Sequence, residues 1–181
     1  VRANLRSESF YFKESATWGA ISSSKFSARY CPVGGLFGAG GYSIFGSPEV
    51  IKIAAGFSSS VLSNYFLEII SPTLNFEAGN LASIPFFREV NRNVLDLVDE
   101  AIKISKINWD RYEVSHDFSC NPLVVGKSNS LASSFENWSI DNIESICKIK
   151  YIEEEINKIF LKAYDLEDEI SPEITEKEIT L

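Results

Sequence analysis

Histidine, cysteine and methionine are scarce in this chain of 181 residues, which contains one histidine, three cysteines and no methionine. Cys31, Cys120 and Cys147 are odd in number and widely spaced, whereas disulfide frameworks and zinc sites need closely spaced pairs. We therefore predict reduced thiols and no metal site. The single histidine, His116, has a neighbour in Asp117 that could orient it as a base, but a lone histidine in a connecting segment is more often structural or exposed than catalytic.

The standard sequence signatures of cofactor-dependent and hydrolytic enzymes are also missing. The chain has no GxGxxG, Walker, HExxH, CxxC or GxSxG motif. The acidic cluster from Glu153 to Glu155 follows the outer face of a predicted helix, where carboxylates are solvated and poorly suited to act as general acids. We therefore predict no catalytic residue and no cofactor site in this chain.

Long apolar runs are absent as well. No stretch reaches the roughly 18 uncharged apolar residues of a membrane span, and the first ten residues, VRANLRSESF, lack the apolar centre of a signal peptide. We expect a cytoplasmic protein with no membrane partner. Because the chain starts with Val1 and has no methionine, we also expect it to be a piece of a longer protein.

Charge is distributed unevenly along a chain that is otherwise typical of folded proteins, with 45% apolar and 23% charged residues. The net charge is −8, which by itself argues against nucleic-acid binding. However, residues 1–45 carry five basic and two acidic side chains (net +3), whereas residues 91–181 carry ten basic and nineteen acidic ones (net −9). Either the two halves have different functions, or this is ordinary variation of a protein surface.

The first half has the pattern of a small strand-rich unit. Aromatic residues alternate with glycine and serine between residues 10 and 45, which predicts short strands near 16–21, 26–31 and 42–46. A helix is expected from Pro48 and a second one from Val61 until Pro72, both within or close to residues 48–70, and strand character returns at 81–87. We predict that residues 1–87 form one part of an α+β fold.

The second half, residues 88–181, is predicted to be mainly helical. An apolar stripe indicates a helix over 91–106, and residues 113–128 have no sustained period and form a long connection. One long helix, or two joined ones, is expected over 131–164, as a packed surface helix or as a docking helix for a partner. The acidic run after Asp165 is expected to be frayed.

Small polar, basic and aromatic residues are interleaved in the first forty-five positions. Phosphates are held by serine, threonine, lysine and arginine, and base edges are contacted by arginine, lysine, asparagine and serine. This composition permits nucleic-acid binding, but on composition alone an aromatic β core is the favoured interpretation. The side chains concerned are Lys13, Thr17, Trp18, Ser22, Ser23, Ser24, Lys25, Arg29 and Tyr30.

Four blocks of sequence occur in a characteristic order and cover more than half of the chain. They are FKESATWGAISSSKFSARYCPVGGLFGAGGYSIF (12–45), SPTLNFEAGNLASIPF (71–86), ISKINWDRYEVSHDFSCNPLV (104–124) and EEEINKIFLKAYDLEDEISPEI (153–174). In this series the chain resembles the carboxy-terminal part of large adenine-specific DNA methyltransferases of the phage-defence BREX type, the PglX family. These enzymes are similar to the fused restriction-modification enzymes of type IIG.

The resemblance implies a function for the parent protein and a narrower one for this chain. The parent would use S-adenosylmethionine to methylate the exocyclic amine of adenine in a short DNA site, with its donor site and its Asn-Pro-Pro-aromatic loop upstream of this region. Residues 121–124, Asn-Pro-Leu-Val, only partly match that loop, because Val124 has no aromatic face to stack on a flipped base. The chain would therefore be a target-recognition region without catalysis or cofactor of its own.

Two hypotheses for the chain follow. In the first, residues 1–87 bind double-stranded DNA: Lys25 and Arg29 contact phosphate or guanine, and Ser23 contacts phosphate. In the second, the helices between 91 and 164 dock on the upstream methyltransferase domain or on another defence protein. The full set of candidate DNA-binding residues is Trp18, Ser23, Lys25, Arg29 and Tyr30, with Asn75 and Phe76 as weaker candidates, and for the aromatic residues simple packing is the alternative.

Overall fold

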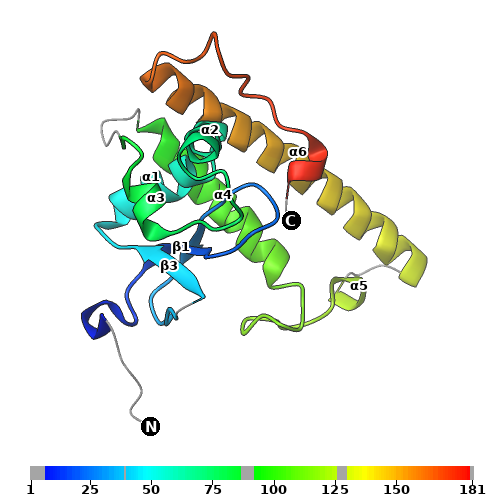
Figure 1. Ribbon diagram of the computed structural model, residues 1–181. Coiled ribbons are helices and arrows are strands. Elements are labelled where there is room, and N and C mark those ends of the chain that lie inside the picture. Colours follow the sequence, from blue (N-terminus) through cyan, green and yellow to red (C-terminus); the bar gives the residue numbers. More distant parts are fainter. Residues whose placement is uncertain (1–6, 39, 87–91, 126–129, 180–181) are drawn as a thin grey trace.

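The computed structural model describes residues 7–38, 40–86, 92–125 and 130–179 (Figure 1). It has a three-stranded antiparallel sheet and a larger set of helices, which confirms the α+β class. Some positions used above lie outside the described residues: Arg2 and Arg6, which contribute to the charge of residues 1–45, and Phe87, Asn91 and residues 126–128, which fall in predicted elements. The elements are β1 (Ser15–Gly19), β2 (Arg29–Cys31), β3 (Gly41–Ile44), α1 (Pro48–Ser58), α2 (Val61–Ile70), α3 (Ala78–Ala82), α4 (Asn93–Trp109), α5 (Pro122–Val125) and α6 (Leu131–Ala163), with short 3-10 turns at Glu8–Phe10 and Glu176–Glu178.

The sheet has the strand order β2-β1-β3, with both outer strands antiparallel to β1. Its strands lie at the three predicted positions but are shorter than predicted. The fourth predicted strand, at 81–87, is wrong in its described part, because α3 and a turn occupy these positions. The backbone amides of Ser83 and Ile84 bond locally, to the carbonyls of Gly79 and Leu81, and Pro85 has no N–H to offer a neighbouring strand.

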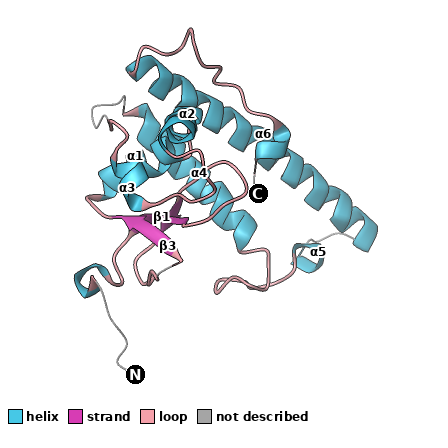
Figure 2. Cartoon of the chain, in the orientation of Figure 1, coloured by secondary structure: helices cyan, strands magenta, loops and turns pink. Residues whose placement is uncertain are grey.

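Helix α1 is the centre of the molecule, and helices α1, α2, α4 and α6 gather on one side of the small sheet (Figure 2). Its Ile51 and Ala55 pack against Ala16 and Ala28 of the strand region. On its other side Gly56 lets α4 approach closely, since a Cβ built there would lie 2.8 Å from Cγ2 of Val98. Pro48 in the first turn and the Ser47 side chain, which accepts from Val50 N–H, start the helix.

Helix α6 is a single element of 33 residues, as one of the two predicted alternatives had it. Its carboxy-terminal half buries Ile149, Ile152 and Ile156, which recur at spacings of three and four residues. These side chains share one core cluster with Trp18 and Phe26 from the strand-rich part, so residues from both predicted parts of the chain meet in one core. The division of the chain at residue 87 stays a prediction.

The segment after α6 packs back along the helix, so the predicted fraying of the acidic tail is wrong for residues 165–179. Leu166 and Ile170 pack against the core, and Ile174 is only 8% exposed. The buried Asn157 of α6 donates from Nδ2 to the carbonyl of Pro172 at 2.9 Å. Apolar residues spaced by four positions within the acidic run therefore anchor it.

Within the part of the chain that the structure describes, no single helix has the length and apolar character needed to cross a membrane. Helices α1 and α2 pass that test only as a pair, and they are bent by 70° relative to each other.

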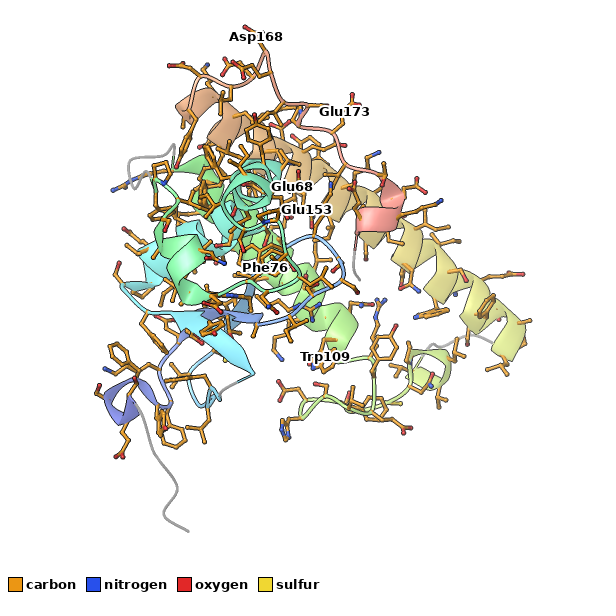
Figure 3. The ribbon with its side chains drawn as sticks, viewed as in Figure 1. Glu68, Phe76, Trp109, Glu153, Asp168 and Glu173 are labelled. Atoms are coloured by element: carbon orange, nitrogen blue, oxygen red, sulfur yellow. The ribbon has the colours of Figure 1, made fainter. Side chains whose placement is uncertain are left out.

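Glu153 of α6 should make the free energy of unfolding depend on pH. Its burial, together with the charge of Glu178, raises the pKa of the carboxyl to about 7 (Figure 3). The folded chain then binds more protons than the unfolded one between about pH 4.5 and pH 7, so its stability falls as pH rises through this window. We expect Glu153→Gln to increase the free energy of unfolding by about 1–3 kcal/mol at pH 8 and to leave it nearly unchanged at pH 4, as measured by urea unfolding. Equal effects at both pH values would contradict the assignment.

Candidate nucleic-acid interface

An extended segment before β2 presents a row of polar side chains to solvent. Phe26 and Ala28 are buried, with exposures of 3% and 8%, whereas Lys25, Ser27 and Arg29 between and beside them are exposed. Successive side chains of an extended chain point to opposite faces, so the three exposed residues share one face. We refer to Lys25, Ser27 and Arg29 as the basic row.

Two side chains at the junction of α1 and α2 hold this segment in place. Phe26 N–H donates to Oδ1 of Asn64 at 2.8 Å, and Nδ2 of Asn64 donates back to the Phe26 carbonyl at 3.0 Å. Ala28 N–H donates to Oγ of Ser59 at 3.3 Å, and that hydroxyl donates to the Ala28 carbonyl at 3.1 Å. Side chains thus replace a neighbouring strand, which explains why β2 starts at Arg29 and not at Phe26.

The basic row lines one shallow hollow with a volume of about 240 Å³. Thr17 of β1 pairs with Arg29 of β2 in the sheet, which places these two side chains next to each other. A second hollow of about 390 Å³ shares Lys25, Phe26 and Phe76 with the first and is also lined by Glu68 of α2. Glu68 and Phe76 are labelled in Figure 3. The first hollow is lined by Thr17, Trp18, Gly19, Ile21, Ser22, Ser24, Lys25, Phe26, Ser27, Arg29 and Phe76.

Four of the candidate residues, Trp18, Lys25, Arg29 and Phe76, therefore lie around the same hollow. Ser23 and Asn75 are exposed but are not part of its lining, and Asn75 forms an isolated antiparallel bridge with Ile21. Tyr30 alternates with Arg29 and points to the other face of β2.

The three aromatic candidates take part in packing. Trp18 is 6% exposed, and its indole N–H donates to the Phe76 carbonyl at 2.9 Å. The Phe76 ring packs against Phe26 with ring centroids 5.1 Å apart. The Tyr30 hydroxyl donates to Oε2 of Glu14 at 2.8 Å, and this hydrogen bond raises the pKa of the Tyr30 hydroxyl. These contacts support the packing interpretation of the aromatic residues, while their contact with DNA stays a prediction.

Ser27 was not among the residues predicted from the sequence, although a signal for it existed. The alternation of Phe26, Ser27, Ala28 and Arg29 between apolar and polar is the pattern of a half-buried extended segment. That alternation would have favoured Ser27 over Ser23, which lies in a bend before the extended part.

Lys25 is engaged by the carboxy-terminal turn of the chain. Its ammonium pairs with the carboxylate of Glu178, and the two side chains are 56% and 30% exposed. This contact, together with a hydrogen bond from the backbone N–H of Thr175, lowers the pKa of the Glu178 carboxyl to about 2. Arg29, by contrast, is exposed beside the hollow.

Comparison with known proteins relates the chain, by sequence, to two adenine-specific methyltransferases. No protein-family model matches the chain. The chain is 33% identical over its whole length to the adenine-specific methyltransferase PglX of Lacticaseibacillus casei (strain Zhang), of which it covers 16%. Over 87% of its length it is 36% identical to the adenine-specific methyltransferase BrxX of Escherichia coli O9:H4 (strain HS), of which it covers 13%. The chain matches one segment of the PglX/BrxX adenine-specific methyltransferases. The resemblance drawn from the four sequence blocks is thereby confirmed.

The described part of this PglX/BrxX-like chain contains no cluster of three or more histidine, cysteine, aspartate or glutamate side chains that could hold a metal ion. His116 is exposed in the connection after α4. Asn121, the first residue of the Asn-Pro-Leu-Val segment, stands directly before the short helix α5, and its side-chain oxygen accepts from Leu123 N–H at 2.9 Å. Its side chain is thus part of a local turn, and the exposed Val124 offers no aromatic ring.

The support of the basic row by Asn64 can be tested directly. We expect Asn64→Ala to accelerate amide hydrogen exchange at Phe26 about tenfold or more, because the Phe26 N–H loses its acceptor and a buried group without a partner costs about 1–3 kcal/mol. Ser145→Ala is the control, since the Ser145 hydroxyl donates to the Asp141 carbonyl within α6. Unchanged exchange at Phe26 in the Asn64 variant would show that other contacts hold the segment.

Proposed function

We propose that this chain is a DNA target-recognition segment of a site-specific adenine-N6 DNA methyltransferase that uses S-adenosylmethionine and serves in phage defence. The observation that carries this proposal is the basic row: three side chains able to donate hydrogen bonds stand on one face of a segment that the scaffold holds by its backbone. Sequence-specific DNA-binding proteins need donors at fixed positions, because specificity depends on hydrogen bonds to base edges at defined positions.

The dimensions of the row suit a DNA groove. Four residue steps of extended chain separate Lys25 from Arg29, which corresponds to about 13 Å at 3.2–3.4 Å per residue. The major groove is about 12 Å wide. In our proposal Arg29 contacts a base edge or phosphate, Lys25 contacts a phosphate, and Ser27 lies between them and binds either group.

Methyl transfer itself is proposed for the part of the parent protein outside this chain. The residues at 121–124 do not fit a base-gripping loop, since Asn121 is committed to a local turn and Val124 stands where a ring is required. We therefore place the S-adenosylmethionine site and the chemistry in the upstream methyltransferase domain, and duplex DNA and that domain are the proposed partners of this chain.

The test is binding of fluorescently labelled duplex DNA to the chain, measured by anisotropy at 50 and 200 mM salt. Lys25→Ala should weaken binding to all sequences and reduce the slope of log affinity against log salt by about 1, because one phosphate contact is lost. Arg29→Ala should cost about 1–3 kcal/mol on a cognate site if it contacts a base.

Lys162→Ala is the matched control, because it removes one positive charge from the last turn of α6 and leaves the row intact. Equal affinity and salt slope for Lys25→Ala, Arg29→Ala and wild type would reject the row as the DNA-binding surface.

A second candidate function, docking on the methyltransferase domain, is favoured by the outer face of α6. Ile140, Ile143 and Tyr151 are 54%, 60% and 61% exposed, and with Cys147 they recur at spacings of three and four on the side opposite Ile149 and Ile152. Between residues 131 and 147 the helix has Glu136, Asp141 and Glu144 but no lysine or arginine. A partner face with apolar residues and a basic rim would match it.

For this docking surface we expect Ile143→Glu to weaken association with the separately produced methyltransferase domain by tenfold or more in calorimetry, since a charge would be buried against apolar groups. Ile69→Glu, at an isoleucine of α2 that is 65% exposed, is the control and should have little effect. Equal affinities for the two variants would argue against docking through the outer face of α6.

A further inference from the structure

The carboxy-terminal segment, residues 171–178, returns along α6 and ends beside the basic row. In Figure 1 the red turn at Glu176–Glu178 lies next to the blue loop that contains Lys25, and the ion pair between Lys25 and Glu178 joins them. An anionic segment of the chain therefore lies against the residue proposed to bind a phosphate.

The position of this segment is fixed by contacts along its length. Asn157 donates to the Pro172 carbonyl at 2.9 Å, and the Asn157 side chain also accepts from Val61 N–H at 3.0 Å. Ile174 is buried, and its N–H points to Oε1 of Glu154 at 3.4 Å. The segment therefore reaches Lys25 from an anchored position on α6 and α2.

The Glu178 carboxylate is also held in its own turn. Oε2 accepts from Thr175 N–H at 2.7 Å and from the Thr175 hydroxyl at 3.1 Å, which leaves Oε1 directed at Lys25. The two ends of Thr175–Glu178 form a capping box. Glu178 thus gives Lys25 an anionic oxygen, the same type of partner that a DNA phosphate would give it.

We propose that this segment regulates the basic row by competing with DNA: Glu178 occupies Lys25 in the free chain, and a phosphate replaces it when duplex DNA binds. This inference rests on the proposed function and deepens it. Lys25 loses one ion pair, to Glu178, when it gains one to a phosphate. The competition therefore lowers the affinity for any duplex that contacts Lys25, and the loss matters most where Lys25 is the main contact. A cognate site, which adds contacts to Arg29 and Ser27, then overcomes the competition more easily than random DNA.

The competition can be measured with the full 181-residue chain and a random 20-base-pair duplex at 50 mM salt. Glu178→Gln should bind about two- to fivefold more tightly than wild type, the factor expected for removal of one exposed ion pair. Glu173→Gln is the matched control: it makes the same change in net charge on the same segment, at a residue whose N–H bonds to Ser171. In a Lys25→Ala background the gain from Glu178→Gln should disappear.

A second readout follows the contact without DNA. After reductive ¹³C-methylation of the lysines, the Lys25 methyl signal should move when Glu178 is changed to glutamine and when duplex is added, but not when Glu173 is changed.

The outcomes separate the two proposals. If Lys25→Ala weakens binding but Glu178→Gln equals Glu173→Gln, DNA recognition stands and the competition is overturned. A Lys25 signal that ignores Glu178→Gln also overturns it. If no variant, Glu178→Gln included, binds duplex at 50 mM salt, the proposed function fails and the competition fails with it.

Discussion

The presentation of the basic row depends on the side chain of Asn64, which donates to and accepts from the backbone of Phe26. Among the residues that the structure describes, no strand pairs with residues 25–28 to satisfy their backbone groups, and buried backbone groups without partners are costly. Asn64 and Ser59 supply these partners from the junction between α1 and α2. The consequence is an extended segment that is held through the backbone of Phe26 and Ala28 and has one face open to solvent.

The junction can do this because the helices around it are packed firmly. Gly56 allows α4 to lie close to α1, and Phe57 packs against Phe160 of α6 with ring centroids 5.2 Å apart. The core thus links the amino-terminal sheet to the last long helix. Helix α6 has a double role in this arrangement: its inner face completes the core, and Asn157 on it anchors both the start of α2 and the returning carboxy-terminal segment.

Much of this could be predicted from the sequence, for identifiable reasons. The helices with strong apolar periodicity, such as α4 and α6, and the three short strands were found because local pattern determines them. The family was identified because four blocks occur in its order, although each block taken singly is a weak signal. Lys25 and Arg29 were chosen from composition, and the structure places both at the same hollow.

The features that were missed depend on contacts between distant residues. The hydrogen bonds of Asn64 to Phe26 join positions 38 residues apart, and no local sequence pattern predicts them. The tail appeared frayed because its charges dominate its composition, yet Leu166, Ile170 and Ile174 anchor it to a core formed elsewhere in the chain. The predicted strand at 81–87 followed β propensity, which the proline and the local hydrogen bonds of α3 overrode.

The most direct test of the central claim, that the basic row is the DNA-contacting surface, is an amide chemical-shift map of the ¹⁵N-labelled chain during titration with duplex DNA. The account predicts that the largest shifts cluster at residues 22–29 and at Thr17, with smaller ones at Thr175 and Glu178 as the turn leaves Lys25. Shifts confined to the outer face of α6, or spread evenly over the surface, would contradict it.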